Sequence, residues 1–158
     1  MAQYIMNQDR CMNPRPVTFI SPIDGLYRGL VVKVVGMATN NIWLDGGDDF
    51  EAYEVELAKT GDEKKDLLIH TTVPKMYDER LDERDFVANK DAICRGHYLT
   101  TGDEYTLPQD FVSGELAVGA EVCLNANGKL EVGTGEVIGE VIRVYNFNGQ
   151  PSVMIRIY

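Results

Sequence analysis

The sequence lacks any long run of apolar residues. No stretch among its 158 residues approaches the roughly 20 consecutive apolar positions that a helix needs to cross a bilayer. The first residues, MAQYIMNQDRCMNPRPVTF, also lack the basic start and the apolar block of a secretion signal. We therefore expect a protein that is made in the cytoplasm and does not enter a membrane.

Positive charge is scarce. The chain holds 15 Lys and Arg residues against 25 Asp and Glu residues, and its formal net charge is −10 at pH 7. A surface of this sign repels the phosphates of DNA and RNA, which argues against direct binding to nucleic acid. The same excess of carboxylates favours solubility at high protein concentration.

Cysteine is also rare. The three cysteines, Cys11, Cys94 and Cys123, lie far apart in the sequence and are odd in number. This pattern argues against a disulfide scaffold and favours synthesis in a reducing compartment. We expect the thiols to be free and to pack as small apolar side chains.

The sequence contains no recognisable catalytic or cofactor-binding motif. The two histidines, His70 and His97, do not form part of a zinc-binding pattern, and no serine stands in a Gly-x-Ser-x-Gly turn. No phosphate-binding loop is present. An acidic cluster does not match the twelve-residue calcium loop and is predicted to be a solvated turn; it comprises Asp45, Asp48, Asp49 and Glu51. We predict a protein without catalytic residues, cofactor or metal, and not an enzyme.

What the sequence contains is a succession of short β-strand patterns. Apolar and β-branched residues alternate with polar ones, and turn residues recur about every 8–12 positions. The strongest turn signals are Asn127-Gly128 and Asn148-Gly149, because an Asn-Gly pair tolerates positive φ at both central positions of a two-residue hairpin. We predict a mainly β fold, with an antiparallel β-barrel, β-tulip-like or sandwich domain.

Two parts of the chain depart from this regular pattern. Residues 1–19 are non-periodic, and Pro14 and Pro16 hold the backbone extended. We predict an extended N-terminal arm or a first edge strand there, followed by a single β-domain over residues 20–158. The apolar residues of the arm either dock on a partner or face the core of a compact domain. Taken as candidate partner-binding residues, they are Tyr4, Ile5, Met6 and Met12.

The second departure is an insertion over about residues 40–90. Its sequence KMYDERLDERDFVANK, residues 75–90, is the helix candidate of the chain. Tyr77, Leu81 and Ala88 lie roughly on one face of such a helix, and mixed charges cover the others. The apolar stripe is thin, so we expect at most one short helix in the insertion.

The stretch from Ala92 to Tyr158 carries turn and strand signals in a characteristic order. In sequence they are Arg95 and Gly96, Gly114 and Gly119, Asn127 and Gly128, then Ile138, Gly139 and Val141. This order resembles the small head decoration, or cement, proteins of tailed bacteriophages. The segment GLYRGLVVKV, residues 25–34, is similar to their opening barrel strand. The likeness covers about half of the chain and leaves residues 40–90 outside it.

The resemblance implies a structural protein of the virion, made in the host cytoplasm and bound to the outer surface of the capsid. Its partner would be the major capsid protein, and the protein would form homotrimers at local threefold positions. There it would bridge neighbouring capsid subunits and oppose the pressure of packaged DNA. Contacts to several subunits at once would supply affinity through avidity. An extended arm would add contact area through strand pairing with the partner.

Three alternatives remain open at this level. The chain could be another virion β-module of the tail, baseplate or collar, which density on a virion would locate. It could be a small β-barrel enzyme, which would need a deep pocket that joins His97, Cys94 and an acid. It could also be a carbohydrate- or peptide-binding module, which would need an exposed aromatic platform. The candidates for that platform are Trp43, Tyr53 and Tyr77.

Overall fold

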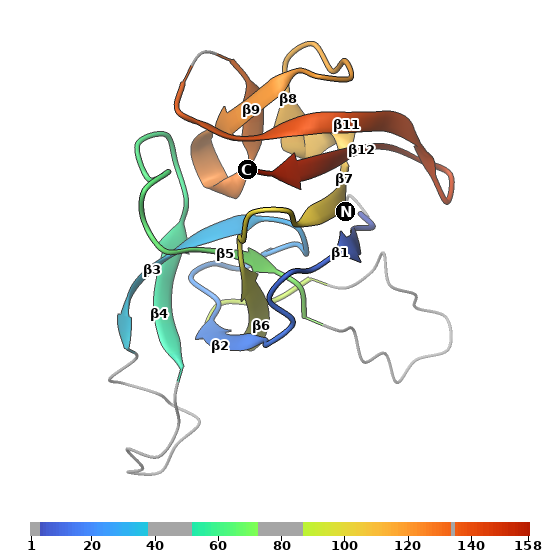
Figure 1. Cartoon of the computed structure of the whole chain (residues 1–158). Coiled ribbons are helices and arrows are strands. Elements are labelled where there is room, and N and C mark those ends of the chain that lie inside the picture. Colours follow the sequence, from blue (N-terminus) through green and yellow to red (C-terminus); the bar gives the residue numbers. More distant parts are fainter. Residues whose placement is uncertain (1–3, 38–51, 73–86, 134) are drawn as a thin grey trace, which may run out of the picture.

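The computed structural model describes residues 4–37, 52–72, 87–133 and 135–158. In this part the chain is mainly β, as the sequence predicts, and consists of a closed five-stranded barrel and a second, seven-stranded sheet that packs against it (Figure 1). Within the described residues the helical elements are single 3-10 turns, and no α-helix is present.

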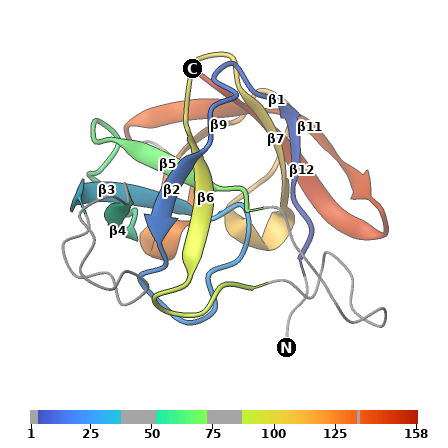
Figure 2. The same cartoon turned by 90° about the horizontal axis from the view of Figure 1, so that it is seen from below.

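The barrel is built from strands in the first two thirds of the chain. Its strand order is β2-β4-β3-β5-β6, and β6 pairs with β2 to close the cylinder (Figure 2). All neighbours are antiparallel except β2 and β4. The strands are β2 (Val17–Ile20), β3 (Val31–Met37), β4 (Tyr53–Leu57), β5 (Leu67–His70) and β6 (Ile93–Tyr98).

The seven-stranded sheet combines the beginning of the chain with its end. Its strand order is β1-β7-β12-β11-β9-β10-β8, with β8 and β10 parallel and the other neighbours antiparallel. The strands are β1 (Asn7–Arg10), β7 (Glu104–Pro108), β8 (Val112–Ser113), β9 (Glu121–Leu124), β10 (Leu130–Val132), β11 (Val137–Phe147) and β12 (Gln150–Ile157). The 3-10 turns are η2 (Gln109–Phe111) and η3 (Ala126–Gly128).

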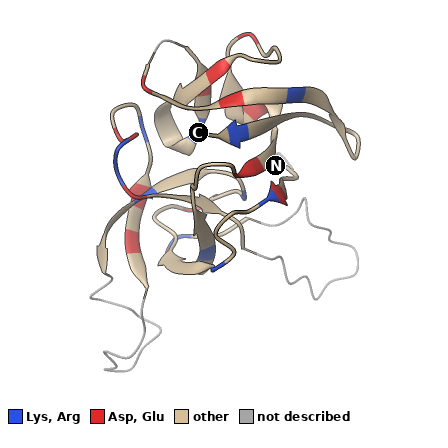
Figure 3. Cartoon of the chain, in the orientation of Figure 1, with Lys and Arg blue, Asp and Glu red and all other residues tan. Residues whose placement is uncertain are grey.

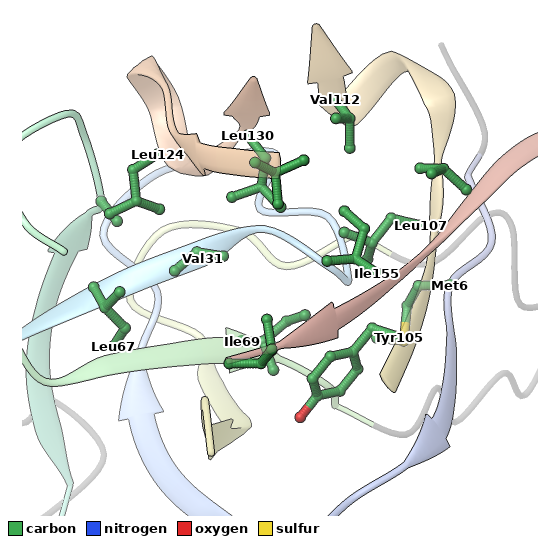
Figure 4. Close-up of a cluster of buried hydrophobic side chains, with 14 of the residues drawn as sticks. Met6, Val31, Leu67, Ile69, Tyr105, Leu107, Val112, Leu124, Leu130 and Ile155 are labelled. Carbon is green, nitrogen blue, oxygen red and sulfur yellow. The ribbon is translucent and has the colours of Figure 1, made fainter. Parts of the chain in front are cut away.

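Two apolar clusters hold these layers together, and strand alternation divides residues between them. Val32 and Leu68 point into the barrel, where they pack with Phe19 and Cys94. Their neighbours Val31 and Ile69 point out of the barrel and pack against the sheet (Figure 4). The sheet contributes apolar side chains to the same cluster, among them Tyr105, Leu107, Leu124, Leu130 and Ile155. Because barrel and sheet share this cluster, each covers an apolar face of the other.

The hairpin between β11 and β12 has the turn that the sequence predicts. Asn148 and Gly149 have φ angles of 50° and 82°, and the flanking Phe147 and Gln150 are paired. Positive φ at both central positions fits the right-handed twist of the two strands. The prediction of a two-residue hairpin is therefore confirmed at Asn148-Gly149.

The loop at Asn127-Gly128 is longer than predicted. Both residues have positive φ, but the turn spans five residues, with the Asn125 N–H bonded to the Lys129 carbonyl at 2.8 Å. The loop bends onto the barrel, since the Gly128 N–H donates to the Ala58 carbonyl at 2.8 Å. A Cβ at position 128 would lie 2.6 Å from the Val31 carbonyl oxygen, so glycine is needed here for close backbone contact.

The N-terminal segment predicted as an arm packs against the rest of the chain in this structure. Strand β1 pairs with β7, and the predicted boundary at residue 19 falls inside β2. The side-chain amide of Gln150 accepts from the Ile5 N–H at 2.9 Å and donates to the Ile5 carbonyl at 2.8 Å. The buried Asp103 carboxylate accepts from the Met12 N–H at 2.7 Å. Both contacts fix the segment to residues that lie more than 90 positions away.

The helix predicted over residues 75–90 falls largely on residues 73–86, which lie outside the described part of the chain. Its last residues, 87–90, are not helical. Ala88 forms an isolated antiparallel bridge with Leu26 instead. The bridge places Ala88 among the buried residues of the barrel cluster.

Candidate docking groove

An open groove of about 730 Å³ lies against the outer face of β6. One wall is formed by Pro14 and Pro16, which precede β2. The opposite side is formed by Thr71 and Thr72 at the end of β5 and by residues 87–89. A volume of this size is in the range of sites that hold a ligand or a short peptide segment.

The floor of the groove follows from the alternation of side chains along β6. Cys94 and Gly96 are buried and point into the barrel, whereas Ile93, Arg95 and His97 lie on the outer face and line the groove. Position 96 has no room for a side chain, because a Cβ there would lie 2.9 Å from the Ile69 carbonyl oxygen. The sequence ICRGHY thus presents an apolar, a cationic and an aromatic polar group in a row.

His97 holds the proline wall in place. Its Nε2 lies 3.3 Å from the Pro14 carbonyl oxygen, and its Nδ1 lies 2.7 Å from the Thr71 hydroxyl. Because a carbonyl oxygen only accepts, Nε2 donates to Pro14, and Nδ1 is hydrogen-bonded to the Thr71 hydroxyl. The imidazole therefore bridges the segment before β2 and the end of β5.

The backbone of β6 at the groove is already hydrogen-bonded within the chain. The Arg95 N–H donates to the Thr72 hydroxyl at 2.8 Å, and the Arg95 carbonyl accepts from the Thr71 N–H at 3.0 Å. The groove therefore offers side chains to a binding partner and not a free strand edge.

The charge of the groove differs from that of the chain as a whole. Among the described residues, its lining includes Arg95 and His97 but no Asp or Glu, although carboxylates outnumber cationic residues 25 to 15 in the sequence. The basic position on β6 is visible in Figure 3. The exposed Arg15, between the two wall prolines, adds a second cationic residue at this edge. The groove is thus suited to a partner that carries negative charge.

The other histidine, His70, has a structural role. It is fully buried, its Nδ1–H donates to the Tyr27 carbonyl at 3.0 Å, and its Nε2 accepts from the Thr72 hydroxyl at 2.8 Å. Its ring packs edge-on against Phe19. Burial and, to a lesser extent, the nearby Arg28 together lower the pKa of His70 from 6.5 to about 4, so the imidazole is neutral at pH 7.

The Cys–His pair considered for an enzyme is not assembled. Cys94 and His97 lie three positions apart on one strand, so their side chains point to opposite faces of β6. Cys94 is buried, its thiol is 3.6 Å from the Ala92 carbonyl oxygen, and burial raises its pKa to about 11. A thiol with this pKa stays protonated at neutral pH and is a poor nucleophile.

The four candidate partner-binding residues differ in how far they are buried in the structure. Ile5 and Met6 are buried in this chain, with exposed fractions of 6% and 2%. Tyr4 is partly buried, packs edge-on against Tyr27 and donates to Asp110 at 3.3 Å. Met12 alone among the four exposes a large apolar surface. Ile5 and Met6 therefore take the second role foreseen for them, as residues that face the core.

Several other sequence candidates lie outside the described residues. They are Trp43, Tyr77 and the acidic cluster of Asp45, Asp48, Asp49 and Glu51. The third aromatic candidate, Tyr53, lies in β4 and packs partly buried against the barrel cluster.

Within the described ranges, no three His, Cys, Asp or Glu side chains lie together in a way that could hold a metal ion. In the same part of the chain no helix is long and apolar enough to cross a membrane.

Neither a protein-family model nor a curated protein matches this chain. Evidence for function therefore comes from the surface of the molecule itself. The groove residues Ile93, Arg95 and His97 were not among the partner-binding candidates from the sequence. The alternation in ICRGHY, with three unlike groups on the outward face of a strand, is the signal that could have identified them.

Proposed function

We propose that this chain is a capsid decoration, or cement, protein. It binds the outer surface of a bacteriophage head and bridges subunits of the major capsid protein. It acts as a homotrimer and stabilises the shell against the internal pressure of DNA.

The positions that carry the sequence resemblance have backbone roles that support this proposal. Gly114 and Gly119 adopt φ angles of 103° and 90° in the turns between β8 and β9. Gly139 allows close strand contact in β11, because a Cβ there would lie 2.5 Å from the Arg156 carbonyl oxygen. The shared motif thus consists of residues that shape a β-scaffold, as expected for a protein that functions through its surface.

The observation that carries the proposal is that the reactive side chains are buried or hydrogen-bonded, whereas the accessible groove is largely apolar. His70 and Cys94 are buried and hydrogen-bonded in the core, and His97 is bonded on both ring nitrogens. The accessible groove beside them is lined largely by apolar residues and by Arg95. A surface of this kind is suited to contact with another protein.

The direct test uses heads assembled without the decoration protein. The purified chain is mixed with such heads, which are then sedimented and challenged with heat or a chelator. We expect the chain to co-sediment in a saturable way and to raise the temperature at which heads release DNA. An unrelated acidic protein of similar size serves as the control.

Image reconstruction of the decorated heads tests the assembly. Density for three copies around local threefold positions is the expected result. Density on the tail, baseplate or collar would assign the chain to another virion structure. Failure to bind any part of the particle would refute the proposal.

A further inference from the structure

We propose that the groove on β6 binds an extended segment of the major capsid protein that presents apolar side chains and a carboxylate. This inference rests on the proposed function and specifies the surface and the chemistry through which the chain contacts the shell.

The apolar residues of the groove are the reason why we expect its occupant to present apolar side chains. Ile93 is 41% exposed on the outer face of β6, and Pro14 and Pro16 are exposed on the facing wall. Val87 and Ala92 extend the apolar lining. Burial of this surface removes apolar area from water, which favours an apolar occupant.

Arg95 is the reason why we expect the segment in the groove to present a carboxylate. Its side chain is exposed between Ile93 and His97, and in the part of the chain that the structure describes no Asp or Glu lines the groove. A guanidinium binds a carboxylate through two parallel hydrogen bonds, which fixes the position as well as the charge of the partner. The chain as a whole has a formal net charge of −10, so an exposed cation such as Arg95 provides a local attraction for an acidic segment.

The hydrogen bonding of β6 determines how the segment lies. Both backbone groups of Arg95 are bonded to Thr71 and Thr72, and β6 has a partner strand on each side in the closed barrel. The segment therefore lies across the outward side chains and does not add a strand to the sheet. Recognition depends on side-chain packing and on the Arg95 contact.

The first experiment identifies the occupant. A photoreactive amino acid replaces Ile93, the variant is bound to heads that lack the decoration protein, and the complex is irradiated. We expect a cross-link to the major capsid protein, at a segment that contains Asp or Glu within a few residues of the cross-linked position. A cross-link to a segment without an acidic residue, or no cross-link from a bound variant, would overturn the inference.

The second experiment tests the charge. Arg95→Glu should weaken binding to heads by about tenfold or more, because it places like charges opposite each other. Arg95→Lys should retain part of the affinity. Lys64→Glu makes the same change in net charge at a residue that is 84% exposed in the turn between β4 and β5, and should bind like the unmodified chain. Thermal unfolding of each variant establishes that it is folded.

The outcomes separate the two proposals. If the unmodified chain binds heads and Arg95→Glu binds equally well, the groove is not the contact surface and the proposed function stands. If Lys64→Glu weakens binding as much as Arg95→Glu, net charge and not the groove determines affinity, and the inference fails. If the unmodified chain does not bind heads, both proposals fail.

Discussion

Lowering the pH should destabilise the fold through a single buried imidazole. In the folded chain His70 is fully buried, and the pKa of its ring is lowered from 6.5 to about 4 by burial and by the nearby Arg28. Above pH 6.5 the ring is neutral in both the folded and the unfolded chain. Between pH 6.5 and pH 4 the unfolded chain binds a proton that the folded chain does not, so stability falls as the pH falls.

The size of the effect follows from the two pKa values. Each unit of difference in pKa corresponds to about 1.4 kcal/mol, so the neutral ring accounts for about 3 kcal/mol that is lost in full below pH 4. By pH 5 the loss is about 2 kcal/mol. This amount is a large fraction of the stability of an ordinary domain. The loss of stability can be measured at pH 5. This pH lies above the isoelectric point of about 4.6, at which the chain is least soluble.

The assay is urea unfolding at a series of pH values from 8 to 5, with the unmodified chain and the variant His70→Asn. An asparagine amide can still donate to the Tyr27 carbonyl but does not titrate in this range. The stability difference at pH 8 measures what the substitution costs in packing and hydrogen bonding. That difference should shrink by about 2 kcal/mol on going to pH 5, because only the unmodified chain loses the contribution of the neutral ring. Parallel pH profiles for the two proteins would refute the reasoning.

Three further predictions concern packing, hydrogen bonding and reactivity. Gly96→Ala should lower the free energy of unfolding by about 1–3 kcal/mol in urea titrations, because its Cβ would lie 2.9 Å from a backbone carbonyl oxygen of β5. Gly36→Ala, with open space at the Cβ position, is the control and should change little. Asp103→Ala should lower the free energy of unfolding by about 3 kcal/mol, because the buried carboxylate accepts from two backbone N–H groups and a tyrosine hydroxyl. The same variant should make the N-terminal segment sensitive to trypsin, and equal trypsin resistance would contradict this prediction. Under native conditions Cys11, which is partly exposed, should react with a disulfide reagent well before Cys94, whose pKa is raised to about 11 by burial; equal rates would contradict the structure.

The strand content of the fold could be predicted from the sequence because it depends on local alternation. Residues 31 and 32 show why the arrangement of the strands could not. Both are valine, so the sequence does not say that one faces the sheet and the other the barrel interior. That division is set by which strands close the barrel, and strand pairing across the chain leaves no local pattern. The turn at Asn148-Gly149 was predictable because its conformation depends on the two residues themselves.

The N-terminal segment shows the same limit more sharply. Its proline-rich, non-periodic sequence favours an extended arm, and the backbone of residues 7–10 is indeed extended, as strand β1. What the sequence does not reveal is its partners in the fold, because the Gln150 amide and the Asp103 carboxylate that fix it lie more than 90 residues away. The groove was missed for a related reason, since its two walls come from residues 14–16 and 71–72 and meet only in the folded chain.

The order of strands along the chain has a consequence for folding during synthesis. All five barrel strands, residues 17–98, leave the ribosome before any strand of the sheet except β1. Until β7 is made, β1 has no neighbouring strand in its sheet. Until the sheet is made, the side chains of Val31 and Ile69, which point out of the barrel, remain in contact with water. The nascent chain therefore exposes an apolar, aggregation-prone face of the barrel while its C-terminal third is translated. This face is where a chaperone would bind.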